Sequence, residues 1–376
     1  MDTANGFEGR KPLLLGQHAR FVLGLVVGII AGVFLVANRS GELETATAAT
    51  YTEGSARPLL WNLRNLYAPW VLEYKGVKRM WAGGWLTDAD RANYSNLIQR
   101  GVAPSTAVGP DKIFYSEFVH GVWTQPVLSF RKVGFHVNDP SVIQPPSSNG
   151  IDRSNWLYMY YTAISNDDIE QGQWNRHTIG FASSADGGRT WTDHGIIISQ
   201  SNGVDNGGAW SPSALVVENQ IWLYYHGNRM PDPVESLQNY RSRLNLNGWQ
   251  LVETDKLVFH HRESCVWGNT SFAYLCPPTY NADGLVKVNL DVSIQNGHFV
   301  LLANDPTSHY ILRFVSDDGI NWQRSSRDTN PILNGGPYFV TTPHAEAVEG
   351  DRYTIYFGFS ATDNSRFDSI HAWEFH

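Results

Sequence analysis

The chain has 376 residues, of which 17% are charged and 13% aromatic, and its formal net charge is −8. This length suits one large domain or two small ones, and the negative charge argues against nucleic-acid binding, which needs a basic surface to replace phosphate counterions. The aromatic residues, together with 34 Gly and 18 Pro, favour short strands joined by turns over a helical protein.

An apolar segment near the N-terminus predicts a membrane anchor. Residues 21–37 (FVLGLVVGIIAGVFLVA) carry no charge and can cross a bilayer core of about 30 Å if the flanking residues reach its surface. Arg10, Lys11 and Arg20 precede the segment, which places the N-terminus in the cytoplasm and the rest outside, in the periplasm or extracellular space. The expected parts are a cytoplasmic tail (1–20), a transmembrane signal anchor (21–38), a linker (39–60) and an exported domain (61–376).

The alternative is a cleaved signal peptide, because Ala46-Thr47-Ala48 resembles a cleavage site of small residues. We favour the uncleaved anchor, since this site lies well beyond the apolar segment and the segment exceeds the usual length of a signal-peptide core. The domain is exported in either case.

The chain has only two cysteines, Cys265 and Cys276. In an oxidising compartment they could form a disulfide or stay reduced, and the sequence leaves both alternatives open. They do not resemble a metal site, which would need further thiolate or imidazole ligands at close spacing. We expect that no cofactor is required and leave a structural calcium ion open.

A phrase that recurs five times indicates an all-β, five-bladed β-propeller. Each copy has a short apolar strand, a polar turn and a second strand rich in aromatic residues, and its apolar run is too short for a helix. Only thirty residues follow Glu346, so one blade must come from residues 61–126 and lie beside the last blade to close the ring. Two insertions, 87–112 and 260–287, interrupt the pattern, and such insertions commonly shape a binding cleft. The copies begin at Pro69, Asp139, Trp210, Leu290 and Pro343.

Two turns have the sequence of an Asp box. Residues 184–191 (SADGGRTW) fit the pattern S-x-D-x-G-x-x-W, residues 316–322 (SDDGINW) are one residue shorter, and residues 247–249 (NGW) resemble a degenerate third copy. In such a turn the aspartate bonds to backbone amides and the tryptophan packs between blades. We therefore assign structural roles to Asp186 and Asp318.

Three acids are the catalytic candidates, because they lie at the starts of repeats. The first strand of each blade lines the propeller axis, so these positions converge although they are far apart in sequence. Acids are depleted from buried strands unless they have a function, although any one alone would more often be structural, and Asp139 before Pro140 could simply cap a turn. The sequence therefore predicts a catalytic site formed by three acids that are taken as equivalent positions of the repeat: Asp139, Asp291 and Glu346.

The phrases around these acids resemble the five-bladed glycoside hydrolases related to family 43. In that family the blades open with Asp-Pro-Ser-Val-Ile, Trp-Ala-Pro, an Ile-Asp-x-Ser type of strand and Glu-Gly-Pro. The corresponding phrases here are residues 139–143 (DPSVI), 210–212 (WSP), 290–293 (LDVS) and 345–347 (AEA), and the resemblance spans residues 137–359.

The resemblance implies Asp139 as general base, Asp291 as the residue that orients and tunes, and Glu346 as general acid of an inverting glycosidase. Cleavage of an acetal needs one protonated and one ionised carboxyl group, about 6.5–9.5 Å apart in inverting enzymes. A third carboxylate would raise the pKa of the donor by repulsion.

Two departures from the family pattern leave alternatives for the acid. Glu346 lacks the following Gly-Pro, and the N-terminal blade is permuted. His344 lies two positions earlier on the same face of the strand and could be the acid, as a histidine is thought to be in the related neoagaro-oligosaccharide hydrolases, or could bind a hydroxyl or an ion. Glu263, in the second insertion, is another alternative.

The sequence thus predicts an exported, membrane-anchored glycoside hydrolase acting on an arabinan-like, xylan-like or cell-envelope glycan. The alternative is a non-catalytic carbohydrate-binding propeller, because propellers support many functions. A sialidase, which the Asp boxes suggest, would need six blades and an arginine cluster that the chain lacks. Trp210 is expected to stack on a sugar. The expected substrate-binding residues are Trp210, His344, Asn138 and His226, with His136 and Asn228 as weaker candidates.

Overall fold

The computed structural model describes residues 66–375 with gaps, together with three short strands that precede them. The chain divides into two compact units, Met1–Thr47 and Ala48–His376. In the first unit β1 (Leu35–Ala37) pairs with β2 (Leu43–Thr45), and the rest of the predicted membrane segment lies outside the described residues. No helix in the described part of the chain is long and apolar enough to span a membrane. The gaps within the propeller are residues 86–87, 149, 174–175, 200–207, 229–236, 260–287, 305–308, 325–331, 335–337, 350–351 and 361–368.

The second unit is a five-bladed β-propeller, which confirms the predicted fold. Blade A has the strand order β4-β5-β6-β7 with β8 also paired to β6, and blade B has the order β9-β10-β11-β12. The insertion between β5 and β6 forms helices α1 and η1, and α2 follows β10. The bounds are β4 (Tyr67–Tyr74), β5 (Val77–Trp85), α1 (Asp88–Gln99), η1 (Pro104–Thr106), β6 (Asp111–Val119), β7 (Val122–Trp123), β8 (Val127–Phe130), β9 (Phe135–Ile143), β10 (Leu157–Ser165), α2 (Asn166–Glu170), β11 (Thr178–Ser184) and β12 (Thr192–Ile198).

Blades C and D continue the ring. Blade C has the order β13-β14-β15-β16, and blade D has the order β18-β19-β20-β21, with β17 parallel to β21 and β22 antiparallel to β20. The bounds are β13 (Ala209–Val217), β14 (Gln220–Asn228), β15 (Leu237–Leu244), β16 (Leu251–Lys256), β17 (Val258–Phe259), β18 (Val288–Gln295), β19 (His298–Asn304), β20 (Tyr310–Ser316), β21 (Asn321–Arg324) and β22 (Leu333–Asn334).

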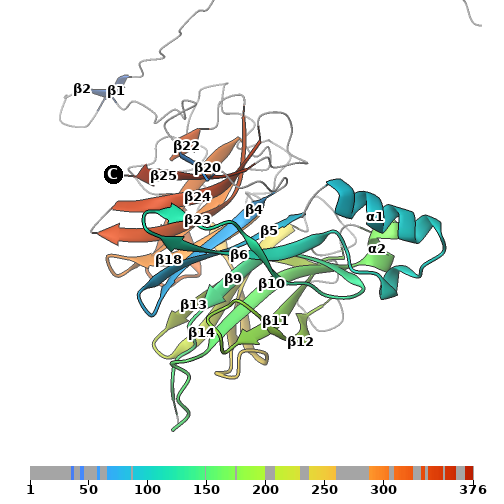
Figure 1. Cartoon of the computed structure of the whole chain (residues 1–376). Helices are drawn as coiled ribbons and strands as arrows, with labels where there is room; N and C mark the ends of the chain where they lie inside the picture. Colours follow the sequence, from blue (N-terminus) through green and yellow to red (C-terminus); the bar gives the residue numbers. More distant parts are fainter. Residues whose placement is uncertain are drawn as a thin grey trace, which may run out of the picture. The chain divides into compact units, whose positions relative to one another are not determined.

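Blade E contains strands from both ends of the propeller. It has the order β23 (Phe339–Glu349), β24 (Arg352–Ser360), β25 (Ser369–Phe375) and β3 (Arg57–Leu59), so its outermost strand comes from the segment predicted as a linker. Figure 1 shows the blue strands β4 and β5 beside the orange and red strands β23 and β24, and β4 contacts β23. This arrangement confirms the permuted closure, which covers edges that would otherwise be free.

The two Asp-box turns have the predicted structural role. Asp186 accepts hydrogen bonds from the backbone amides of Arg189 and Thr190, 3.1 Å each, and Asp318 accepts two backbone hydrogen bonds of 2.8 Å in the same way. Although burial acts to raise it, these bonds hold the pKa of both carboxyl groups below the usual range. The carboxylates therefore fix the turns.

Candidate active site

The inner strand of every blade is interrupted by a β-bulge at the same point. The pairing with the second strand shifts there, and one residue takes a positive φ of between 43° and 52°. A non-glycine residue in this region is strained by about 1–3 kcal/mol, and bulges near active sites turn side chains in a new direction. In four of the blades a proline follows. We call these five the bulge residues: Ala68, Asp139, Ser211, Asn289 and Thr342.

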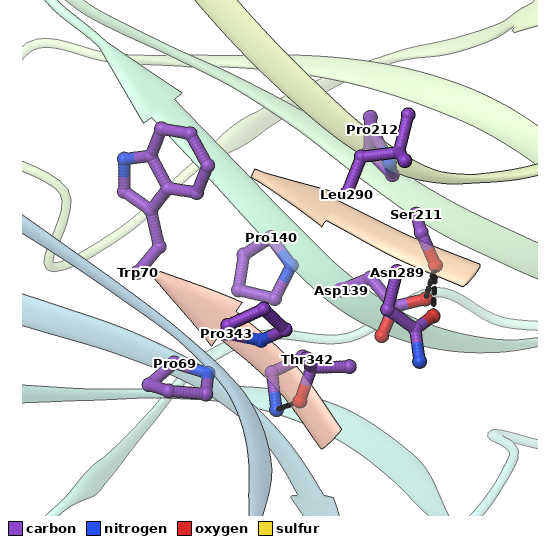
Figure 2. Close-up of a pocket in the computed structure, with 11 residues that line it drawn as sticks. Pro69, Trp70, Asp139, Pro140, Ser211, Pro212, Asn289, Leu290, Thr342 and Pro343 are labelled. Atoms are coloured by element: carbon purple, nitrogen blue, oxygen red, sulfur yellow. Dashed lines mark hydrogen bonds between the residues drawn. The ribbon is translucent and has the colours of Figure 1, made fainter. Parts of the chain in front are cut away.

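The bulge residues and the residues that follow them line a narrow pocket of about 20 Å³, the channel pocket (Figure 2). Since every inner strand contributes to it, the pocket lies where the five blades converge. Asp139 is the only ionisable side chain among the described residues that line it. The structure thus places one of the three predicted acids in the channel.

Asp139 is partly buried and receives two hydroxyl contacts. Thr162 Oγ1 donates to its Oδ2 at 2.9 Å, and Ser211 Oγ donates to the same oxygen at 3.3 Å. Burial raises the pKa of Asp139 to about 6; the two hydroxyls act to lower it, and the charge of Asp111 raises it. A carboxyl group with this pKa can exchange a proton near neutral pH.

Polar side chains continue around the channel from Asp139. Ser211 Oγ also lies within hydrogen-bond distance of Asn289 Oδ1, so that Asn289 Oδ1 and Asp139 Oδ2 share its single proton. The side-chain NH2 of Asn289 donates to Thr341 Oγ1 at 3.0 Å. The chain of polar groups stops at blade A, where the bulge residue is Ala68. Oδ1 of Asp139 has no hydrogen bond within the described residues, so this oxygen is available to a water molecule or a substrate hydroxyl.

The other two predicted acids lie at different depths along their strands. Counted from the bulge residue of its own strand, Asp139 is at position 0, Asp291 at +2 and Glu346 at +4. At about 3.3 Å per residue, these offsets correspond to about 7 and 13 Å along a strand. The prediction that the three acids occupy equivalent repeat positions is therefore wrong, because the repeat phrases do not show where each bulge lies.

Asp291 and His344 form a buried pair. Asp291 is 2% exposed; its Oδ2 accepts the Ala345 amide at 2.8 Å, and its Oδ1 lies 3.2 Å from His344 Nδ1. His344 Nε2 donates to the Val71 carbonyl at 2.9 Å. Although burial acts to lower it, the charge of Asp291 and these hydrogen bonds raise the pKa of His344, so that the imidazolium form is favoured. Neither side chain is among the described residues lining the channel pocket.

This pair belongs to a ring of hydrogen bonds between neighbouring blades. In every blade the side chain at position +2 bonds to the backbone of position +3 in the next blade, and the last bond joins blade E to blade A. Asp291 and His344 therefore hold the ring closed. The inter-blade ring consists of Trp70 Nε1 to Val142 O (2.7 Å), Ala214 N to Ser141 Oγ (2.8 Å), Val292 N to Ser213 Oγ (2.9 Å), Ala345 N to Asp291 Oδ2 (2.8 Å) and His344 Nε2 to Val71 O (2.9 Å).

Glu346 is bound by other side chains. Its Oε2 accepts Lys78 Nζ at 2.8 Å and the Tyr356 hydroxyl at 3.0 Å. Aligned on the proline that follows the bulge residue, the Glu-Gly-Pro phrase of family 43 falls on residues 341–343 (TTP), so a threonine stands where the resemblance leads us to expect the glutamate.

Two of the expected substrate-binding residues lie next to bulge residues. Trp210 and Asn138 each precede one and are partly exposed, and Asn138 donates to the Tyr67 hydroxyl at 2.8 Å. His226 is 1% exposed, with its ring 4.5 Å from that of Trp210 and its Nδ1 2.9 Å from Asn239 Oδ1. His226 therefore packs against Trp210 in the protein interior. His344, 6% exposed, is also buried, and neither histidine is among the described residues that line the channel pocket.

A further acid, Asp111, lies at the junction of blades A and B. Its Oδ2 is 3.2 Å from His136 Nδ1, while Asp111 Oδ1 and His136 Nε2 are buried without a hydrogen-bond partner among the described residues. Burial is the largest effect that raises the pKa of Tyr67, and the charges of Asp111 and Asp139 raise it further. Asp111 begins a third strand, β6, so the pattern of repeat starts in the sequence does not reveal it.

The remaining candidates lie elsewhere. Glu263, Cys265 and Cys276 fall outside the described residues. Within the part of the propeller that is described, no group of three or more His, Cys, Asp or Glu side chains could hold a metal ion.

Sequence comparisons place part of the chain near another glycosidase family. Residues 146–266 match the family model of the Glycosyl hydrolases family 32 N-terminal domain. This span is about a third of the chain and contains none of the three predicted acids. No curated protein matches the sequence.

Solved structures are similar over most of the chain. They include a GH43_1 enzyme from Xanthomonas citri (TM-score 0.54, 14% identity, 85% of this chain and 89% of that chain) and an α-L-arabinofuranosidase from Lactobacillus brevis (0.54, 13%, 84% and 91%). A family-43 β-xylosidase/α-arabinofuranosidase from a compost microbial metagenome is also similar (0.54, 12%, 85% and 94%). The chain therefore has the five-bladed fold of the family-43 glycoside hydrolases, with a divergent sequence.

Proposed function

We propose that the chain is a glycoside hydrolase that cleaves a polysaccharide or oligosaccharide in the channel pocket. The observation that carries this proposal is Asp139, the ionisable side chain of the described pocket lining, whose pKa is raised to about 6. Similar solved structures are family-43 enzymes, and that of Xanthomonas citri was solved with xylose and with xylotriose. Xylan-like and arabinan-like glycans, together with cell-envelope glycans, are therefore the substrates to test.

In this proposal Asp139 is the general base of an inverting reaction. Its Oδ1 holds a water molecule and removes a proton as that water attacks the anomeric carbon. Thr162 and Ser211 hold Oδ2 and so fix the orientation of the carboxylate. A second group must protonate the leaving oxygen.

The residue that acts as proton donor can be identified by comparing the activity of variants on two kinds of substrate. A donor variant loses activity on a natural glycosidic bond but keeps it on an aryl glycoside, because an acidic phenol leaves without protonation. The variants to compare are Asp111→Asn, Glu263→Gln and Glu346→Gln. We expect Glu346→Gln to retain wild-type activity on both substrates, since Lys78 and Tyr356 bind its carboxylate, and a selective loss on the natural bond would restore Glu346 as the acid.

The Asp111→Asn variant is expected to move the pH profile. A general base must be ionised, so kcat/KM should rise with pH through about 6, the pKa of Asp139. Because the charge of Asp111 raises that pKa, its removal should shift the acidic limb to lower pH. The measurement is kcat/KM against pH, with Asp317→Asn, whose side chain is 91% exposed, as the matched control. If the acidic limb of the pH profile does not move in Asp111→Asn, the charge of Asp111 does not influence the pKa of Asp139.

The test of the function is a screen of the full chain against xylans, arabinans, galactans and cell-envelope glycans. We expect sugar release from at least one of them by the wild type and none by Asp139→Asn. Equal product from both proteins would remove Asp139 from the mechanism.

The engagement of Asp291 and Glu346 in other contacts favours a second candidate function, a carbohydrate-binding propeller without catalysis. A protein that binds a glycan in the screen and releases no product would support this candidate.

From the sequence we also propose that residues 21–38 anchor the protein and place the propeller outside the cytoplasm. Carbonate extraction of membranes tests the anchor, and protease added to intact cells tests the location. A wild-type protein released by carbonate would contradict the anchor.

A further inference from the structure

A second pocket of about 310 Å³ lies between blades B and C, away from the channel pocket. One of its lining residues, Tyr158, pairs with Ile143, four residues beyond Asp139 on β9. This offset is about 13 Å along the strand, toward the opposite end of the blade. This second pocket, the blade B–C pocket, is therefore separate from the channel. Its lining is aromatic and polar and includes Arg153, Trp156, Phe181, His194, Asn247 and Trp249.

Trp249 occupies the Asp-box position of blade C but is not buried like its counterparts. Trp322 of blade D is 0% exposed, and Trp191 of blade B is half-buried. Trp249 is 47% exposed, with its ring 5.9 Å from that of His194 and 6.0 Å from that of Phe181 on blade B. The groove that a tryptophan fills elsewhere is thus left partly open here.

The pocket combines aromatic faces with groups that form hydrogen bonds. Trp156, 40% exposed, contributes a second indole from the loop between β9 and β10. Arg153 is 6% exposed, and its Nη2 lies 3.4 Å from Asn247 Oδ1. Ser183 Oγ lies 2.8 Å from His194 Nε2. The volume lies at the lower end of the usual range for small-ligand sites, about 300–1,000 Å³.

We propose that the blade B–C pocket is a second carbohydrate-binding site, which holds a short neutral saccharide segment against Trp156 and Trp249. Flat aromatic faces pack on the C–H faces of sugars, and the guanidinium, amide and hydroxyl groups bond to their hydroxyls. The charges of Arg153 and Asp152 in the lining balance, which favours a neutral ligand. The choice of a carbohydrate rests on the proposed function. A polymer held here stays at high local concentration near the channel of the same molecule.

The experiment follows the indole N–H signals of the full-length Asp139→Asn protein by NMR during titration with xylotriose, arabinotriose and galactotriose. We expect the signals of Trp156 and Trp249, assigned from Trp156→Ala and Trp249→Ala, to shift and saturate with at least one saccharide. Trp249→Ala should weaken this binding by about tenfold or more, as the loss of a central aromatic contact does. Phe118→Ala is the matched control, because Phe118 is a 39% exposed aromatic residue on blade A.

The outcomes separate this inference from the proposed hydrolysis. If the wild type cleaves a glycan through Asp139 but neither indole signal moves with any of the three saccharides, the second site is rejected and the hydrolase stands. If the signals saturate but no Asp139-dependent cleavage occurs, the second site stands and the hydrolase is rejected. An equal loss of binding in Phe118→Ala and Trp249→Ala would also reject the site.

Discussion

Replacing Asp139 by asparagine is expected to reduce glycan hydrolysis by about 10²- to 10⁴-fold, the usual contribution of a general base. Asparagine keeps the shape of the side chain and its neighbours Thr162 and Ser211, but it cannot take a proton from the attacking water. The measurement is kcat/KM on the glycan found in the screen. An intact circular dichroism spectrum shows that the fold is retained.

The same variant should be more stable than the wild type above pH 6. A carboxyl group whose pKa is raised from 3.8 to about 6 holds its proton more tightly when folded, so its ionisation destabilises the fold as the pH rises from about 4 to 6. Since Asp139 is partly exposed, we expect a difference of roughly 1–3 kcal/mol in the free energy of unfolding. Urea denaturation should show it at pH 8 and not at pH 3. Lower stability of the variant at pH 8 would refute the raised pKa.

The largest loss of stability is expected from Asp291→Ala, about 3–5 kcal/mol in the free energy of unfolding. The change leaves the buried imidazolium of His344 and the Ala345 amide without their partner, and so removes the bond of the inter-blade ring that joins blades D and E. Ser213→Ala is the matched control, because it removes a neutral bond of the same ring and should cost about 1–3 kcal/mol. Urea denaturation at pH 6 measures both. Equal losses would show that the charged pair has no special role.

The pair also predicts how stability changes with pH. The pKa of His344 is raised above its ordinary value of 6.5, so its contribution is complete below about pH 6.5 and is lost as the pH rises through the folded pKa. Asp291→Asn removes the neighbouring charge and should reduce this alkaline loss. A wild-type protein whose stability stays constant between pH 6 and 9 would contradict the pairing.

The sequence by itself determined the architecture of this protein. Short apolar strands, their turns and the Asp boxes depend on local composition and backbone preference, so five copies of the same phrase were enough to predict five blades and the permuted closure. The structural roles of Asp186 and Asp318 follow from the sequence for the same reason, because their partners lie within the same turn. Asp139 was placed in the channel because its repeat begins at the bulge residue itself.

Only the tertiary structure decided which other side chains share the channel with Asp139. The direction of a side chain on an inner strand depends on where the bulge lies, and the bulge is set by pairing with the next strand and by one residue of positive φ. Asp291 and Glu346 stand in similar phrases but two and four residues past that point, so they bond to His344 and to Lys78 instead. Asp111 reaches the vicinity of Asp139 from a neighbouring blade, a proximity that arises only when the ring is assembled.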